Sequence, residues 1–222
     1  AAVGPFAIEA GLVRATEPVT RVRIHATNTG KLLGALVPVR QGRARVMGDF
    51  AIAGVPGTGA EIIMDYSQTA GSRTGKMLPT GQLRDHIRME DGRTLEVSIA
   101  DVACSCVFVR AVDLGMRGDE LPEAIHVDAA LIARMIELRG KAAQLLGLAS
   151  DWRKADEESP SSPFLVAVAP ASDYRSLEDE PVQARDMDLN ARFMYLNRCH
   201  TAMADRKSTR LNSSHLGISY AV

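Results

Sequence analysis

The stretch Val19–Val39, VTRVRIHATNTGKLLGALVPV, carries the strongest strand signals in the sequence. Its first eight residues alternate strictly in side-chain direction, so that Val19, Arg21, Arg23 and His25 face away from Thr20, Val22, Ile24 and Ala26. Such alternation is typical of a half-buried β-strand. The Asn-Thr-Gly sequence at 28–30 favours a turn, and KLLGALVPV supplies the next strand. This part of the chain is therefore predicted to be built mainly of short strands.

Similar signals surround this stretch. AAVGPFAIEAGLV at 1–13 predicts a short apolar helix, and ARVMGDFAIAGV at 44–55 and AEIIMDY at 60–66 predict further strands. Gln-Gly and Pro-Gly-Thr-Gly turns separate these strands. The polar, glycine-rich segment 67–82, SQTAGSRTGKMLPTGQ, is interpreted as a domain junction.

The chain after the junction mixes strands with one strong helix. RTLEVSIA at 93–100, CVFVRAV at 106–112, FLVAVAP at 164–170 and DMDLNARFMYLN at 186–197 read as strands. An amphipathic helix is predicted from Asp128, a favourable N-cap, to Gly147, a favourable residue just past a helix end. A further helix is expected to begin after His200. The pattern predicts an α+β fold.

The composition excludes several classes of protein. The chain has 222 residues, 46% of them hydrophobic, and its 26 basic and 27 acidic residues give a formal charge of −1. This balance predicts neither nucleic acid nor an anionic membrane as a partner. No apolar run approaches the roughly 18 residues that a membrane-spanning helix needs. Three cysteines do not make a disulfide framework, and such sparse usage fits a reducing cytoplasm.

The last segment, DRKSTRLNSSHLGISYAV at 205–222, shows no helix or strand period. Its codons can reproduce a common short-read sequencing adapter, so we interpret it as an artefact. Without its three basic residues and one acidic residue, the formal charge becomes −3. The chain also begins without Met, inside what reads as a helix, so its natural N-terminus is expected to be missing.

Two glycine-rich motifs do not support nucleotide binding. In GSRTGKM at 71–77, three residues rather than four separate the glycines, and Met77 follows Lys76 where a Walker A loop has Ser or Thr. GVPGTGA at 54–60 opens no apparent helix, so a dinucleotide fingerprint is equally unsupported. Cys104 and Cys106 lack a second Cys or His pair at zinc spacing, so buried thiols are expected and no metal site.

The segment YLNRCHTAM at 195–203 is the most suggestive local site. A strand is expected to end in a turn that bears Asn197, Arg198, Cys199 and His200, with a helix following. A helix N-terminus attracts a carboxylate, and an adjacent arginine binds one in a bidentate way. A thiol there would have a lowered pKa. An ordinary helix start with a buried cysteine explains the residues equally well.

Six stretches in series resemble the PrpF-like family of unsaturated-acid isomerases, which has the diaminopimelate epimerase fold. They are AAVGPFAIEAGLV (1–13), VRIHATNTGK (22–31), GDFAIAGVPGTGAEIIMDY (48–66), AGSRTGKMLPTG (70–81), VFVRAVDLG (107–115) and DMDLNAR (186–192). The resemblance implies two pseudo-symmetric domains, 1–72 and 73–204, each a barrel-like β-sheet around a central helix, both cut short. It also implies an active site between them.

The resemblance implies a cofactor-independent proton-transfer isomerase of an unsaturated tricarboxylic acid, such as 2-methylaconitate or 4-oxalomesaconate. Its catalytic cysteine and a lysine are expected upstream of Ala1, so the chain itself is expected to be inactive and poorly stable. The expected substrate-binding residues are Thr80, Gly81, Gln82, Cys104, Ser105, Asn197, Arg198, Cys199 and His200. The expected partner is the small acid, without nucleic acid or membrane, and a homodimer is allowed.

The sequence departs from the family pattern at Gln82, where Asn is common, and at Cys104 and Ser105, where Asn-Pro is common. A second hypothesis is therefore a binding protein of the same fold that holds an organic acid without converting it. The Arg-Cys-His sequence at 198–200 is more like the tautomerase branch of the family. A nucleotide-binding protein that relies on Lys76 is disfavoured by the glycine spacing.

Overall fold

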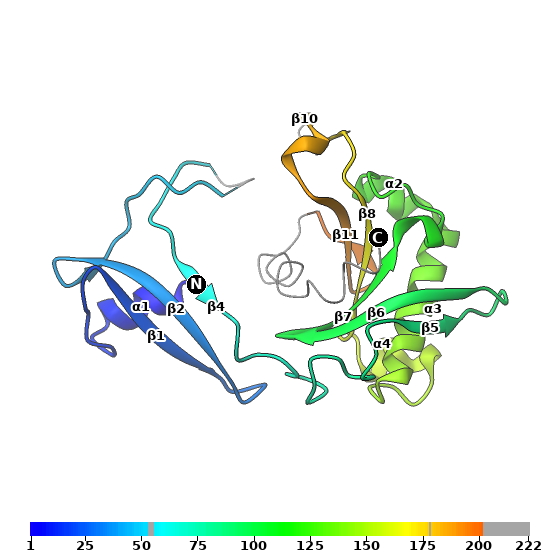
Figure 1. The fold of residues 1–222 in the computed structure, drawn as a ribbon, viewed down its shortest axis with the longest axis horizontal. Helices are drawn as coiled ribbons and strands as arrows, with labels where there is room; N and C mark the ends of the chain where they lie inside the picture. Colours follow the sequence, from blue (N-terminus) through cyan, green and yellow to red (C-terminus); the bar gives the residue numbers. More distant parts are fainter. Residues whose placement is uncertain (53–55, 178, 202–222) are drawn as a thin grey trace. The chain divides into compact units, whose positions relative to one another are not determined.

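The computed structural model describes residues 1–52, 56–177 and 179–201 (Figure 1). The chain divides into two compact units: unit 1 is Ala1–Ser72, and unit 2 is Arg73–Val222. The segment 205–222, interpreted above as an artefact, lies outside the described residues.

Unit 1 is built on the predicted pair of strands. Its described elements are α1 (Val3–Glu9), β1 (Val19–Ala26), β2 (Lys31–Arg40), β3 (Arg43–Ala44) and β4 (Ile63–Asp65). β1 and β2 pair antiparallel over their length, from Val19 opposite Pro38 to Ala26 opposite Lys31, which confirms both strands. β4 pairs with the other edge of β2. The opening helix is shorter than predicted, and its Ala7 and Ile8 pack against buried residues of the two long strands.

The strand predicted at 44–55 is largely wrong. Only Arg43–Ala44 pairs, with the end of β2, and Phe50 forms an isolated bridge with Gly59. Val46 and Met47 are 78% and 76% exposed. Apolar, strand-favouring residues form a strand only where a neighbour offers its backbone groups, and no such neighbour is found here among the described residues. Residues 53–55 lie outside the description.

Unit 2 contains a larger sheet and most of the helices. Its described strands are β5 (Asp85–Arg88), β6 (Thr94–Val102), β7 (Cys104–Arg110), β8 (Phe164–Pro170), β9 (Tyr174–Arg175), β10 (Pro181–Val182), β11 (Leu189–Tyr195) and β12 (Arg198–Cys199). Its described helices are α2 (Pro122–Val127), α3 (Ala129–Leu145) and α4 (Ala155–Glu158), with 3₁₀ turns η1 (Ala111–Leu114), η2 (Trp152–Lys154) and η3 (Ala184–Asp186). Among the helices described in the chain, none is long and apolar enough to cross a bilayer.

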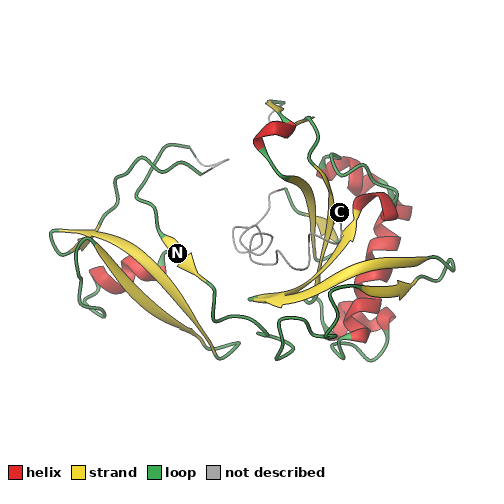
Figure 2. Ribbon diagram, viewed as in Figure 1, coloured by secondary structure: helices red, strands yellow, loops and turns green. Residues whose placement is uncertain are grey.

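The main sheet of unit 2 has the strand order β12-β11-β8-β7-β6-β5. Its pairs are antiparallel except β7 with β8, which are parallel. Helices α2 and α3 lie on one side of this sheet (Figure 2). The long helix is confirmed, with Asp128 as its N-cap accepting a hydrogen bond from the Leu131 amide at 2.8 Å. The buried residues Leu131, Met135 and Leu138 form its apolar stripe.

The mixed fold is confirmed, but the barrel-like form is not. A barrel closes only when its first and last strands pair. Among the described strands of unit 2, β5 pairs with β6 and β12 pairs with β11, and these two edge strands do not pair with each other. The sheet of unit 2 is therefore open, and the long helix α3 packs against one of its faces instead of being enclosed by it. The helix expected after His200 is absent at residues 200 and 201, and the rest of that prediction falls beyond the described residues.

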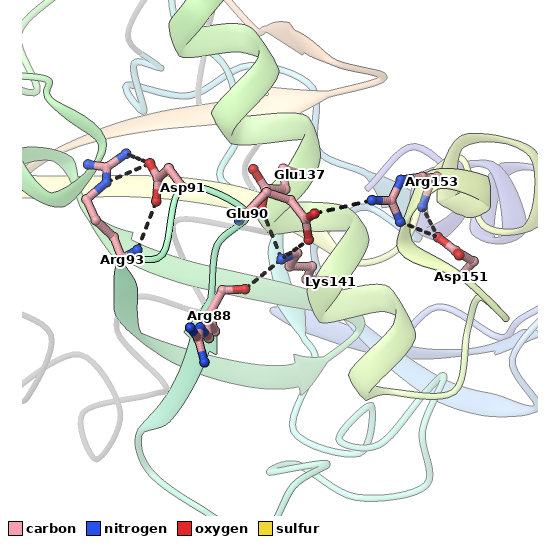
Figure 3. A network of polar contacts seen from close by, with 8 residues as sticks. All are labelled: Arg88, Glu90, Asp91, Arg93, Glu137, Lys141, Asp151 and Arg153. Atoms are coloured by element: carbon pink, nitrogen blue, oxygen red, sulfur yellow. Dashed lines mark hydrogen bonds and ion pairs between the residues drawn. The ribbon is translucent and has the colours of Figure 1, made fainter.

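A network of charged side chains fixes α3 to the β5–β6 turn (Figure 3). Lys141 donates to the Arg88 carbonyl at 2.7 Å and to Glu90 at 2.8 Å, and it forms an ion pair with Glu137 at 3.1 Å. Glu137 in turn accepts from the Glu90 amide at 2.6 Å. The helix is therefore anchored to the sheet by polar contacts as well as by its apolar stripe.

Candidate functional site

One end of the six-stranded sheet gathers most of the predicted site residues. Register places Asp101 of β6 opposite Ser105 of β7, and the parallel strand β8 begins beside Cys106. β11 runs antiparallel to β8, so its last residue, Tyr195, reaches the same end, where it pairs with Arg198. The segments around Cys104–Ser105 and Asn197–His200 are therefore neighbours at this end, although about ninety residues separate them in the sequence.

The loop that carries Thr80, Gly81 and Gln82 runs along β6 toward β5. It is held by the Met77 carbonyl, which accepts from the Asp101 amide at 2.8 Å. The Thr80 hydroxyl donates to Asp85 at 2.9 Å and accepts from the Gln82 amide at 3.2 Å. Its proton is thus already directed at a carboxylate, so Thr80 has to change partner before it can donate to an acid.

Asp85 is an ionisable residue that sequence reasoning missed. Burial raises the pKa of the Asp85 carboxyl, while the hydrogen bond from Thr80 works in the opposite direction. A carboxyl group with a raised pKa, bonded to a predicted binding residue, is a feature of functional sites. No local sequence signal marks it, because DHIR at 85–88 is too short and polar to read as a strand.

Cys104 and Ser105 begin β7 after a tight turn in which Ala103 has a φ of 59°. Ser105 is fully buried, and its Oγ lies 2.5 Å from the Oγ of Ser162, just before β8. Cys104 is half-buried. Of this predicted pair, only Cys104 is accessible to a ligand, while Ser105 joins two strands.

Asp101, near the end of β6 and opposite Ser105, holds the segment that begins at Arg73. Its fully buried carboxylate accepts from the Arg73 amide at 2.8 Å and from the amide and hydroxyl of Thr74 at 2.7 and 2.8 Å. These bonds fix the start of the segment that leads to Thr80. A single acidic residue closing an apolar strand is the signal that could have found it.

The Asn197–His200 segment combines a buried thiol with exposed polar groups. Cys199 is 4% exposed, and its amide donates to Nε2 of His126 at 3.0 Å. Burial raises the pKa of the Cys199 thiol to about 11, with Arg192 acting in the opposite direction. The lowered pKa expected for this thiol is therefore wrong, because burial disfavours the thiolate.

Arg198 and His200 are exposed beside this thiol. The guanidinium of Arg198 has no ion-pair partner among residues 1–52, 56–177 and 179–201, so it is available to a carboxylate. The His200 ring packs edge-on against Phe193, with ring centroids 6.2 Å apart. Asn197 donates from its side chain to Asp156 at 2.7 Å.

The predicted site residues do not all lie close enough together to contact one small ligand. The loop bearing Thr80 leads into β5 and Arg198 lies on β12, at opposite edges of the sheet with four strands between. Cys104 and Ser105 begin a strand between these edges. In the part of the chain that the structure describes, no three His, Cys, Asp or Glu side chains gather as metal ligands. The arrangement places the exposed guanidinium of Arg198 and several fixed turns at one end of the sheet.

Comparison with known proteins identifies the family to which the sequence is similar. The sequence model of the PrpF protein matches residues 1–215, a range that reaches into the terminal segment starting at Asp205. A 3-methylitaconate isomerase of Eubacterium barkeri is 45% identical over 205 residues, which cover 92% of this chain and 54% of the relative. The chain thus spans about half the length of the curated relatives it matches.

Other relatives have related names. A 2-methyl-aconitate isomerase of Shewanella oneidensis is 32% identical over 91% of this chain and 53% of its own length. A (4E)-oxalomesaconate Delta-isomerase of Novosphingobium is 38% identical over 78% of this chain and 45% of its own length. The crystal structure of a methylitaconate-delta-isomerase superposes with a TM-score of 0.87 at 44% identity, covering 93% of this chain and 53% of that one.

Proposed function

Because this chain belongs to the PrpF protein family, we propose that the protein is an isomerase that moves a proton within an unsaturated carboxylic acid. The family match carries this proposal. The relatives named after methylitaconate, methylaconitate and oxalomesaconate support it, since all three acids combine a carbon–carbon double bond with at least two carboxylates. We infer that 2-methylaconitate, 4-oxalomesaconate and 3-methylitaconate are the candidates for the substrate.

The proposed reaction needs only acid–base groups, because shifting a double bond changes no oxidation state. A base removes an allylic proton, donors aimed at the charge stabilise the resulting dienolate, and a proton returned to the other end of the allylic system completes the double-bond shift. Arg198 is proposed to bind one carboxylate, since its guanidinium is exposed and free of ion pairs among the described residues.

The base itself is proposed to lie outside residues 1–222. The thiol of Cys199, with a pKa of about 11, stays protonated at neutral pH and makes a poor base. The resemblance to the family implies a catalytic cysteine and a lysine upstream of Ala1. We therefore expect the 222-residue chain alone to bind the acid without converting it.

A binding protein without turnover is the alternative. It rests on the departures of Gln82, Cys104 and Ser105 from the family pattern. Both hypotheses predict acid binding at Arg198, and they differ only in proton transfer.

The test has two stages. In the first, the 222-residue chain is titrated with the three acids by NMR, and Arg198→Gln is compared with Arg175→Gln, an exposed arginine on β9. Loss of binding in Arg198→Gln alone supports the site, whereas equal binding in both variants overturns it.

In the second stage, the unmatched half of the Eubacterium barkeri relative is joined to the chain, and the incorporation of solvent deuterium into the acid is followed. Deuterium incorporation supports an isomerase, and binding without it supports the alternative.

A further inference from the structure

Arg139 is a buried arginine in the middle of α3, with its side chain 6% exposed. Its guanidinium donates to Asp156 at 2.9 Å, to the Pro160 carbonyl at 3.0 Å and to the Ser159 carbonyl at 3.3 Å. Burial lowers the pKa of Arg139, and the nearby Asp156 opposes this change. A buried charge is costly unless it is paired and hydrogen-bonded, so this arginine requires its partners in place.

One arm of these contacts leads to the turn between β11 and β12. Asp156 uses its second oxygen to accept from the Asn197 side chain at 2.7 Å. A single carboxylate therefore joins the buried guanidinium of α3 to the residue that precedes Arg198.

That turn needs an anchor because its backbone is strained. Leu196 and Asn197 have φ values of 47° and 59°, the left-handed pair required by a two-residue hairpin of type I′. Asparagine tolerates this region, but leucine does not favour it. Leu196 is 51% exposed, so packing of its side chain gives little in return. The side-chain bond of Asn197 to Asp156 fixes the turn itself from outside the hairpin, while the bond of the Cys199 amide to His126 holds the strand that follows.

A second arm leads from Arg139 to the start of β7. The guanidinium fixes the carbonyls of Ser159 and Pro160, and the Ser159 hydroxyl donates to the Ser162 carbonyl at 2.6 Å. The Ser162 hydroxyl in turn contacts Ser105. Arg139 is therefore linked by hydrogen bonds to two segments of predicted site residues, Cys104–Ser105 through Ser159 and Ser162, and Asn197–His200 through Asp156.

We propose that Arg139 is a positioning residue, which acts through Asp156 to hold the Leu196–Asn197 turn and so sets the direction in which Arg198 presents its guanidinium. This proposal rests on the proposed acid site at Arg198. It means that a buried residue of α3 affects how well that site is positioned. Arg139 itself is too buried to contact the acid.

The test measures amide hydrogen exchange in the complete 222-residue chain. Asp156→Ala removes the link but leaves Arg139 its loop carbonyls, and Asn197→Gly keeps a residue that adopts positive φ while removing the anchoring amide. In both variants, exchange of the His200 amide, which bonds to the Phe193 carbonyl, should rise about tenfold, the equivalent of one hydrogen bond. Amides within α3 should not change in Asn197→Gly, because this variant leaves Arg139 paired with Asp156. Arg139→Lys should behave like Asp156→Ala, because one ammonium group cannot reach all three partners.

Arg175→Met, which breaks an exposed ion pair with Asp179, is the matched control and should leave exchange at His200 unchanged. An unchanged His200 amide in Asn197→Gly or in Asp156→Ala would overturn the proposal, as would an equal rise throughout α3 in Asn197→Gly, which would indicate a general loss of stability. Affinity for 3-methylitaconate, measured by NMR titration, should fall severalfold in Asp156→Ala and not in the control. If the parent chain binds no acid, the proposed function fails, while the exchange result still decides whether Arg139 positions the turn.

Discussion

The hydroxyl oxygens of Ser105 and Ser162 lie 2.5 Å apart in the interior of unit 2 and join the starts of the two parallel strands β7 and β8. Both residues are buried, at 0% and 3% exposure. Ser105, a predicted ligand-binding residue, therefore also has a structural contact in the interior.

Removing one member of this pair should destabilise the protein more than removing both. Ser105→Ala leaves the Ser162 hydroxyl buried without its partner, at a cost of about 1–3 kcal/mol, whereas a buried pair replaced together loses less. Urea unfolding of the two single variants and of Ser105→Ala with Ser162→Ala measures this coupling. Strictly additive losses would show that the contact contributes nothing to stability.

Gly140 is expected to be irreplaceable in α3 even by alanine. On helix propensity alone, Gly→Ala stabilises a helix by about 1 kcal/mol. Here the added Cβ would lie 2.4 Å from the Trp152 carbonyl oxygen, a backbone atom that cannot move aside alone. We therefore expect Gly140→Ala to lower the free energy of unfolding by about 1–3 kcal/mol, as measured by urea titration. A stabilised variant would mean that η2 shifts away from the helix without loss.

The network around Lys141 should make stability depend on acid pH. The hydrogen bond and charge of Lys141 hold the pKa of Glu90 below its usual range. A lowered pKa in the folded state contributes stability above the ordinary glutamate pKa of about 4.3, which is lost as the pH falls through the folded value. Glu90→Gln should therefore flatten the decline in unfolding free energy below about pH 5. Glu157→Gln, at an exposed position of α4, is the control and should retain the decline of the parent chain.

The sequence correctly predicted the helices and strands whose own residues carry a clear pattern. β1, β2 and β8 have unbroken alternation or an apolar run, and α3 has a cap and a helical stripe. The strand expected at 44–55 failed because pairing depends on a partner elsewhere in the chain. The open edges of the larger sheet could not be foreseen either, since closure depends on register across six strands.

The candidate site was predictable only at its turns. Asn197 and Arg198 follow a strand signal and were found by it, but their support comes from far away in the sequence. Arg139 is a charged residue of the predicted helix. It is buried because its guanidinium donates hydrogen bonds to loop carbonyls and to Asp156, 17 to 21 residues later. Such partners leave no periodic signal near the residue itself.

The buried thiol of Cys199 should react more slowly than that of half-buried Cys104. At pH 8, iodoacetamide is expected to label Cys104 first, because the thiolate is the reactive species and the Cys199 pKa of about 11 keeps its thiol protonated. Peptide mass spectrometry over time measures both rates, and the chain unfolded in urea, where the two thiols should react alike, is the control. The raised pKa also predicts how stability depends on alkaline pH. The stability contributed by the neutral thiol of Cys199 is present below about pH 8.5 and is lost as the pH rises toward 11.

Both expectations depend on the burial of Cys199. Faster labelling of Cys199 than of Cys104 in the folded chain would contradict this burial and would show that the β11–β12 turn opens readily.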